Sequence, residues 1–288
     1  MARQARRGWA GLGVAIVALA LPAGAFAHSG EFAKFDDCPT TTVGVAHCLY
    51  SVTGGGEVLL GKTATPIVNK VILQGGYSKE NAEHVSTFFA ASDGQTLTKA
   101  PQPVPGGLLG IVPPASSPPL LKALAKRFFE SKWTGVNATL ELAGPASAIK
   151  ISTFNLLVEE GLALQVPVKI HLENPFLGGS CYVGSDRAPI VYSFTTGFTS
   201  PPPPNQPIEG NPGFIELKEE ARIAELTQTR LVDNSWAAPK ASGCGGVLAP
   251  LVDPIIDARI GLPSAAGHNA VILENTVDTA TPAAVNSN

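Results

Sequence analysis

Alternation of apolar and polar residues from Leu162 to Glu173 constrains the fold of this chain more than any other feature. In the run LALQVPVKIHLE every second residue from Leu162 to Leu172 is apolar, and most residues between them are polar. Successive side chains of a β-strand point to opposite faces, so this period of two predicts a half-buried strand. Pro167 cannot donate to a ladder, which predicts an edge strand or a bulge. His171 falls on the polar face, where we expect a solvated side chain.

Other segments repeat this pattern of short, β-branched or alternating runs. Glycine clusters at 54–56 and 75–76 are interpreted as turns between them. A set of about nine to eleven short strands predicts a mainly β fold, an antiparallel β-sandwich or barrel-like domain. The main expected strands are 43–53, 66–74, 135–142, 148–152, 162–173, 189–197, 222–228 and 269–279.

Two segments depart from the strand pattern. Residues 119–133, PLLKALAKRFFESKW, predict an amphipathic, basic helix, and with the proline-rich stretch before it they form an insertion at 101–133. We interpret this helix as packed on the domain with its lysines in water; a membrane-surface or partner-binding helix is the alternative. Residues 247–260 contain Pro250 and Pro254 and predict a short or broken helix, or a buried loop.

The first 27 residues have the layout of a secretory signal peptide. Three arginines precede an apolar run at 9–21, and Ala25-Phe26-Ala27 supplies the small-x-small cleavage pattern. The run is shorter than the roughly 20 residues that a spanning helix needs. We therefore expect cleavage after Ala27 and a single secreted domain, residues 28–288, without a transmembrane span. Its expected location is extracellular or in the cell envelope.

Removal of the signal peptide would make the chain distinctly acidic. The whole sequence has 20 basic and 23 acidic residues, and loss of the three arginines leaves 17 basic residues and a net charge of −6. Nucleic-acid binders concentrate positive charge, so a nucleic-acid partner is not expected. Since 44% of the residues are hydrophobic and only 15% are charged, a folded core is expected.

All four cysteines lie in the exported part, where an even number is typical of disulfides. Four cysteines allow three pairings. Cys38 and Cys48 are close in sequence, whereas Cys181 (GGSCYVGS) and Cys244 (ASGCGGV) both lie among glycines, which permit close approach of two backbones. We therefore favour Cys38–Cys48 and Cys181–Cys244.

The sequence assigns no catalytic, cofactor-binding or metal-ligating residue. Ser180 lies beside Cys181 but lacks the G-x-S-x-G pattern of a nucleophile elbow, as does Ser264. The five histidines are scattered singly, and no C-x-x-C pair indicates a zinc site. A structural role for Cys181 is therefore favoured over a reactive one, and no cofactor is expected.

Several blocks together resemble a known group of proteins. They are PVPGGLLGI, TLELAG, LENPFLGGSCYVGS, the stretch from TTG to PPPPN, LVDNSWAAPKASGCGG and GLPSAAGHNAVIL, within residues 38–285. The group is that of uncharacterised exported proteins from high-GC Gram-positive (actinobacterial) bacteria, which have no assigned activity. The resemblance implies an exported bacterial protein and transfers no active-site residue.

Three classes of function remain open. The first, which the sequence favours, is a non-catalytic envelope or extracellular protein that binds a partner or contributes to the cell surface. The second is an extracellular hydrolase, whose candidate groups would be Asp36, Asp37 and His47, or the adjacent Glu159 and Glu160. The third is a carrier of an apolar ligand inside the β core, which a cavity lined by the apolar strand faces would favour.

Overall fold

The computed structural model describes residues 28–129 and 131–287; the expected signal peptide lies outside them. The strands are β1 (His47–Leu60), β2 (Thr63–Pro66), β3 (Val71–Tyr77), β4 (Ser86–Ala90), β5 (Gln102–Pro103), β6 (Asn137–Leu142), β7 (Lys150–Ile151), β8 (Leu164–Glu173), β9 (Tyr182–Val183), β10 (Ile190–Phe194), β11 (Phe214–Lys218), β12 (Ile223–Asp233), β13 (Ala241–Ser242) and β14 (Ala270–Ala280). The α-helices are α1 (Pro119–Phe129), α2 (Thr153–Val158), α3 (Ala249–Ile260) and α4 (Pro282–Asn286), and the 3₁₀ helices are η1 (Gly30–Phe35), η2 (Ala146–Ala148) and η3 (Gly246–Leu248).

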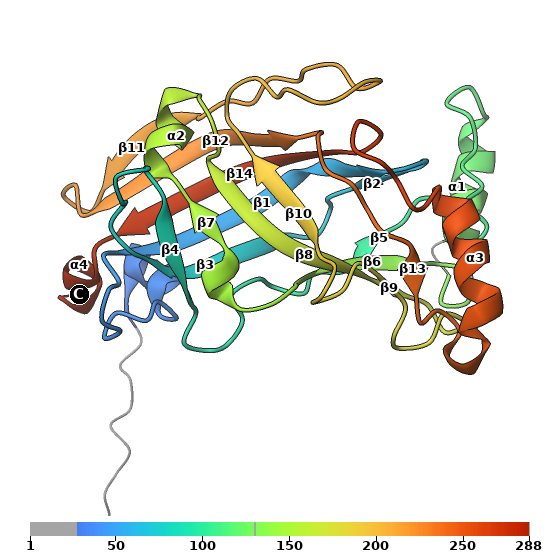
Figure 1. Cartoon of the computed structure of the whole chain (residues 1–288), viewed down its shortest axis with the longest axis horizontal. Coiled ribbons are helices and arrows are strands. Elements are labelled where there is room, and N and C mark those ends of the chain that lie inside the picture. Colours follow the sequence, from blue (N-terminus) through green and yellow to red (C-terminus); the bar gives the residue numbers. More distant parts are fainter. Residues whose placement is uncertain (1–27, 130, 288) are drawn as a thin grey trace, which may run out of the picture.

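The expected mainly β, antiparallel fold is confirmed. One layer contains β11, β12, β14, β1 and β3, with β2 beside the far half of β1. The second layer is built around β8, which pairs with β7 and β6 along one edge and with β10 and β9 along the other. β4 joins the layers along one side, and a bridge between Thr195 and Val232 joins β10 to β12 along the other. In Figure 1, β8 and β10 cross obliquely over β1, β12 and β14, with α1 and α3 at one end.

The alternation that predicted β8 is confirmed, although its position in the sheet is not an edge. Leu164, Val166, Val168, Ile170 and Leu172 are all buried. Neighbouring strands flank β8 on both sides. The expectation of an edge strand was therefore wrong. The proline is tolerated inside the sheet because the partner along one edge changes from β7 to β6 close to it, which leaves a gap in the ladder at that point.

The two glycine clusters lie inside strands and not in turns. β1 continues through Gly54–Gly56, and its register with β14 shifts between Thr53 and Gly55. A Cβ on Gly56, whose φ is +108°, would lie 2.0 Å from the carbonyl oxygen of Ile272. These glycines therefore permit a bulge and close strand approach, which sequence alone does not distinguish from a turn.

Helix α1 forms where it was expected, but it does not pack as expected. None of its described residues is buried, and the exposed fractions of Leu120, Leu124 and Phe128 are 72%, 58% and 54%. The interpretation of this helix as packed on the domain is therefore wrong. No helix within residues 28–129 and 131–287 has the length and apolar character needed to cross a bilayer.

Candidate ligand-binding site

Two adjoining cavities lie between the layers of the sheet. The outer cavity has a volume of about 90 Å³ and reaches α3, which supplies Ile256, Arg259 and Ile260 to its lining. The inner cavity has a volume of about 60 Å³ and lies deeper between the layers. Ile67 and Val71 line both cavities. The two cavities are therefore neighbours, and we refer to them together as the interlayer cavity.

The walls of the interlayer cavity are mainly the apolar strand faces. Along β8, Leu164, Val166 and Val168 line the inner cavity, and Ile170 and Leu172 line the outer one. The opposite layer contributes further aliphatic side chains from β1, β12 and β14, namely Val58, Leu60, Leu231, Val271 and Leu273. The period of two in the sequence therefore produces the apolar wall directly.

Few polar side chains reach the outer cavity. The side-chain amide of Gln102 is already hydrogen-bonded within the protein. Its oxygen accepts from the backbone N–H groups of Val68 and Asn69, and its nitrogen donates to the carbonyl oxygen of Asn69. Thr63 and Thr65 of β2 also line the cavity, and neither hydroxyl has a hydrogen-bond partner within the described chain.

Arg259 is the only charged side chain in the lining of the outer cavity. Its Nε is buried and has no hydrogen-bond partner among the described residues. The guanidinium lies against the backbone of Gly110, where a Cβ would come within 1.0 Å of Nη2. The loop that contains Gly107 and Leu108 therefore closes over Arg259 at the end of the cavity.

Tyr192 of β10 is the notable polar side chain of the inner cavity. Only 2% of it is exposed, and its hydroxyl has no partner among the described residues. Burial, and secondarily the charge of Asp233, raises the pKa of the phenol, so the group stays neutral. Its ring packs edge-on against Trp236, with centroids 5.0 Å apart. Tyr192 therefore adds an unpaired phenol to a mainly aliphatic lining that also includes Ser51, Thr53 and Asn275.

Replacing Tyr192 with phenylalanine is expected to raise the free energy of unfolding by about 1 kcal/mol, because an unpaired buried hydroxyl costs more than it contributes. Tyr77 provides the matched control, since it is 4% exposed but its hydroxyl is hydrogen-bonded to Thr279. Tyr77→Phe should lower the free energy of unfolding by a similar amount. Urea denaturation measures both changes, and an equal loss for both variants would show that Tyr192 has a partner.

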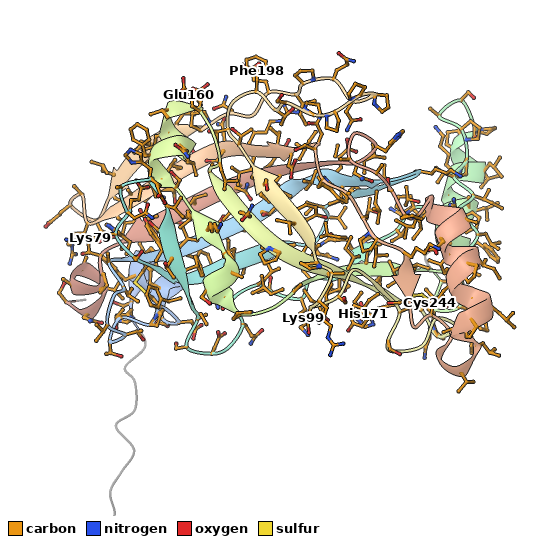
Figure 2. The ribbon with its side chains drawn as sticks, in the orientation of Figure 1. Lys79, Lys99, Glu160, His171, Phe198 and Cys244 are labelled. Carbon is orange, nitrogen blue, oxygen red and sulfur yellow. A yellow bond between two sulfur atoms is a disulfide. The ribbon has the colours of Figure 1, made fainter. Side chains whose placement is uncertain are left out.

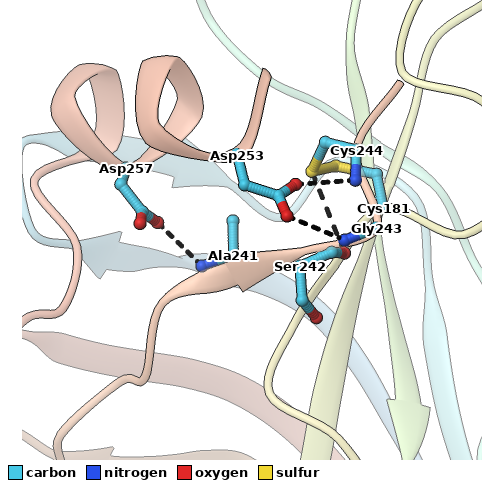
Figure 3. The surroundings of a disulfide bond; sticks show 7 residues. All are labelled: Cys181, Ala241, Ser242, Gly243, Cys244, Asp253 and Asp257. Carbon is cyan, nitrogen blue, oxygen red and sulfur yellow. Dashed lines mark hydrogen bonds between the residues drawn. A yellow bond between two sulfur atoms is a disulfide. The ribbon is translucent and has the colours of Figure 1, made fainter. Parts of the chain in front are cut away.

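The expected disulfide pairing is confirmed. Cys38 is bonded to Cys48 with their Cα atoms 5.5 Å apart, and Cys181 is bonded to Cys244 with their Cα atoms 4.1 Å apart. The second bond joins the segment just before β9 to the segment between β13 and η3 (Figure 3). Ser180 is exposed, and a Cβ on Gly243 would lie 2.3 Å from the carbonyl oxygen of Ser180, so the glycine allows the two chains to cross.

Two aspartates of α3 fix this helix to the same region. The carboxylate of Asp253 accepts hydrogen bonds from the backbone N–H groups of Gly243 and Cys244, at 3.2 and 2.8 Å. Asp257 accepts from the N–H of Ala241 at 2.7 Å. Figure 3 shows both carboxylates turned toward β13. The disulfide and these bonds therefore hold the helix that closes the outer cavity.

The candidate hydrolase groups near the start of the domain are not assembled. Asp36 is 2.7 Å from His28, and burial raises the pKa of Asp37. His47 stacks on the ring of Tyr77 at 5.1 Å, and burial lowers its pKa. None of the described cavities is lined by these groups. Ser264 is buried, and its backbone pairs with that of Ala238.

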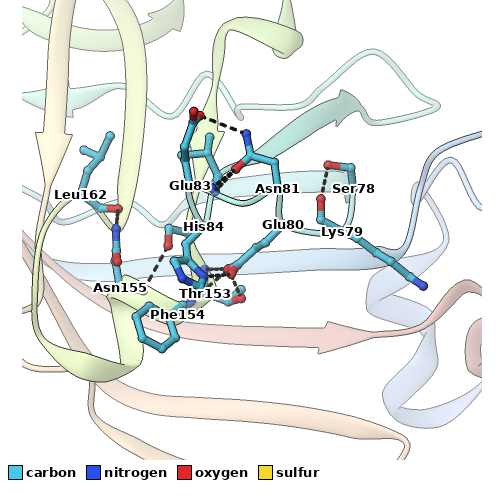
Figure 4. Close-up of polar contacts among 12 residues, drawn as sticks. Ser78, Lys79, Glu80, Asn81, Glu83, His84, Thr153, Phe154, Asn155 and Leu162 are labelled. Carbon is cyan, nitrogen blue, oxygen red and sulfur yellow. Dashed lines mark hydrogen bonds and ion pairs between the residues drawn. The ribbon is translucent and has the colours of Figure 1, made fainter.

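The other candidate carboxylates, Glu159 and Glu160, are exposed at the end of α2. In contrast, the carboxylate of Glu80 forms hydrogen bonds to this short helix. It accepts from the N–H and hydroxyl of Thr153, both at 2.6 Å, and from the N–H of Phe154 at 3.0 Å (Figure 4). Glu80 therefore holds the first turn of α2, a structural role.

Two facing carboxylates occur on β12 and β14, at Glu225 and Asp278. Hydrogen bonding from Lys218 lowers the pKa of Glu225, whereas burial raises that of Asp278. Lys34 of η1 covers the pair, with its Nζ 2.9 Å from Asp278. Divergent pKa values are typical of acid–base pairs. However, neither carboxylate lines a described cavity, so the arrangement fits a structural ion-pair network.

His171 lies on the outer face of β8, as expected, but it is less solvated than expected. The ring of Tyr182 stacks on it at 4.5 Å, and its Nε2 is buried without a hydrogen-bond partner in the described chain. Figure 2 shows it near Lys99, and both approach Glu141. No group of three or more potential metal-ligating side chains occurs within residues 28–129 and 131–287.

No protein-family model, curated protein or solved structure matches this chain. Sequence reasoning missed Arg259 and Tyr192. The available signal for Arg259 was that it is the one cation in the otherwise apolar and acidic segment VLAPLVDPIIDARI.

Proposed function

We propose that this protein binds and carries a small apolar ligand in the interlayer cavity. The observation that supports this function is a pair of neighbouring, mainly aliphatic cavities between two layers, with a minority of polar groups in their linings. Ligand sites in proteins are typically concave and mainly apolar, with a small number of polar groups that orient the ligand. Of the three functions that the sequence left open, the carrier is the one that this geometry favours.

The size of the cavity favours a slender ligand. An engineered apolar cavity of roughly 150 Å³ binds benzene and stays free of water. The outer and inner volumes of about 90 and 60 Å³ match an unbranched hydrocarbon group better than a fused ring system. At roughly 0.8 kcal/mol for each buried CH₂, burial of an eight-carbon chain is worth about 6 kcal/mol before the cost of association, so the Kd should be no lower than about 20 μM and binding should be weak.

The proposal includes export from the cytoplasm. The signal peptide of residues 1–27, the two disulfides and the resemblance to exported actinobacterial proteins support a location outside the cytoplasm. A hydrolase has less support, because its candidate carboxylates and histidines do not line the interlayer cavity.

Calorimetric titration with octan-1-ol, a neutral apolar probe, tests the proposed function. We expect saturable binding with one molecule per chain. Absence of a binding heat up to the solubility limit, or uptake that never saturates, would remove the basis for a carrier.

The exposed face of α1 favours a second function, docking on an anionic lipid surface. Within its bounds the helix has three basic residues, Lys122, Lys126 and Arg127, and no acidic one, whereas the exported chain as a whole is acidic. Exposed leucines and phenylalanines beside basic side chains are typical of helices that lie in a membrane interface. This function corresponds to the surface-binding class that the sequence suggested.

The double change Leu124→Gln and Phe128→Gln is expected to reduce co-sedimentation with phosphatidylglycerol vesicles at least several-fold. Its effect on the free energy of unfolding should stay within about 0.5 kcal/mol, because both side chains are exposed. The matched control is Leu217→Gln with Phe198→Gln, two exposed side chains; Phe198 (Figure 2) and the strand β11 that contains Leu217 (Figure 1) both lie away from α1. Equal vesicle binding by both double variants would exclude α1 as the docking surface and leave a protein partner as the alternative.

A further inference from the structure

We propose that the ligand of the interlayer cavity is a single-chain amphiphile with an anionic head group, and that Arg259 binds the head group. This inference rests on the proposed function and adds the chemical class of the ligand. The hydrocarbon chain would extend from Arg259 past Ile170 and Leu172 toward the inner cavity.

The first reason is that Arg259 has no counter-charge among the residues that the structure describes. It forms no ion pair or hydrogen bond with any described residue. The nearest acidic residues along α3, Asp253 and Asp257, bind backbone N–H groups of the segment around β13. The side chain of Arg259 is partly exposed, but its Nε is buried without a partner, and buried polar atoms are normally hydrogen-bonded. A bound anion would supply the missing partner.

The second reason is the position of the guanidinium at one end of the apolar space. It lies against Gly110, so the absence of a side chain at that residue leaves room for it. The backbone N–H of Lys62 donates to the carbonyl oxygen of Ile260 at 2.7 Å, which places the turn between β1 and β2 beside the end of α3. The cavity therefore has a charged end at Arg259 and an apolar interior.

The third reason is the chemistry of the neighbouring groups. A guanidinium presents parallel N–H donors that match the two oxygens of a carboxylate or phosphate. The unpaired hydroxyls of Thr63 and Thr65, on the same lining, can donate further hydrogen bonds. A guanidinium is a cation, so the site should favour anions over amines.

The test is a calorimetric comparison of octanoate, octyl phosphate, octan-1-ol and octylamine at one ionic strength. Octanoate or octyl phosphate should bind wild-type protein about 10-fold more tightly than octan-1-ol, and octylamine should bind least well. Arg259→Gln should weaken binding of the anions by about 10-fold or more and change binding of octan-1-ol less than about 2-fold. Arg259→Lys should keep part of the preference for anions over octan-1-ol, because lysine retains the positive charge but lacks the planar guanidinium with its parallel N–H donors.

The outcomes separate the two proposals. The preferred anion identifies the head group as a carboxylate or a phosphate. If octan-1-ol binds as tightly as both anions, or if Arg259→Gln weakens all probes equally, the head-group assignment is wrong and the apolar carrier remains. If no probe binds to the wild-type protein, the carrier function itself is wrong. Retained binding of octan-1-ol by Arg259→Gln also shows that this variant is folded.

Discussion

Replacing Cys181 and Cys244 together with serine is expected to lower the free energy of unfolding by about 4 kcal/mol. The bond closes a loop with a sequence separation of 63, so its loss frees a long segment of the unfolded chain. Both cysteines are fully buried, and two serine hydroxyls in their place would add a further cost. Because the bond also anchors the region that holds α3, we expect affinity for octan-1-ol to fall as well.

The matched control is the double change of Cys38 and Cys48 to serine. This bond has a sequence separation of 10, and on the same model its loss should cost a little under 3 kcal/mol. It lies in a separate small core with Phe32 and Phe35, away from the interlayer cavity, so ligand affinity should be unchanged. Urea denaturation of both variants measures which disulfide contributes more to the free energy of unfolding. A larger loss from the short loop would refute the ranking by loop length.

The second large effect is expected from Ala138→Phe, which should abolish binding of both octan-1-ol and octanoate. Ala138 lies on the cavity-facing side of β6, between Val136 and Leu140, and it lines the outer cavity. A phenyl ring at this position would occupy the space that the ligand needs. The change should cost at most about 1 to 3 kcal/mol of stability, since the existing space accepts much of the ring.

Ala64→Phe is the matched control for the blocked cavity. Ala64 is exposed on β2, between Thr63 and Thr65, whose side chains line the outer cavity. The same substitution on the outer face of this strand should leave affinity within about 2-fold of wild type, as is usual for surface changes. Wild-type affinity in Ala138→Phe, with the protein folded, would place the ligand elsewhere.

Much of the fold could be predicted because its long strands have two different faces. β6 alternates strictly and β8 alternates except at Pro167, and burial follows the alternation along β8 with the same exception. β5, β7, β9 and β13 contain only two residues each, too few for a period to be visible. Glycines inside β1 and β3 were interpreted as turns, because the close approach that they permit depends on a strand distant in sequence.

The candidate site could be predicted only in part. The residues of β8 that form its wall were assigned to an apolar face, but a cavity is the space left between side chains from distant segments. The amphipathic pattern of α1 identified an apolar face without showing whether anything covers it. Arg259 and Tyr192 became candidates only when their missing partners were known, and partners are set by tertiary structure.

A titration of protein with ¹³C-labelled isoleucine, leucine and valine methyl groups locates the ligand directly. Addition of octanoate should shift the methyl signals of Ile67, Val71 and Leu140, which line both parts of the interlayer cavity. The signals of Leu120 and Leu124 on α1 should stay unchanged. Shifts confined to α1, or no shift at saturating octanoate, would contradict ligand binding between the layers.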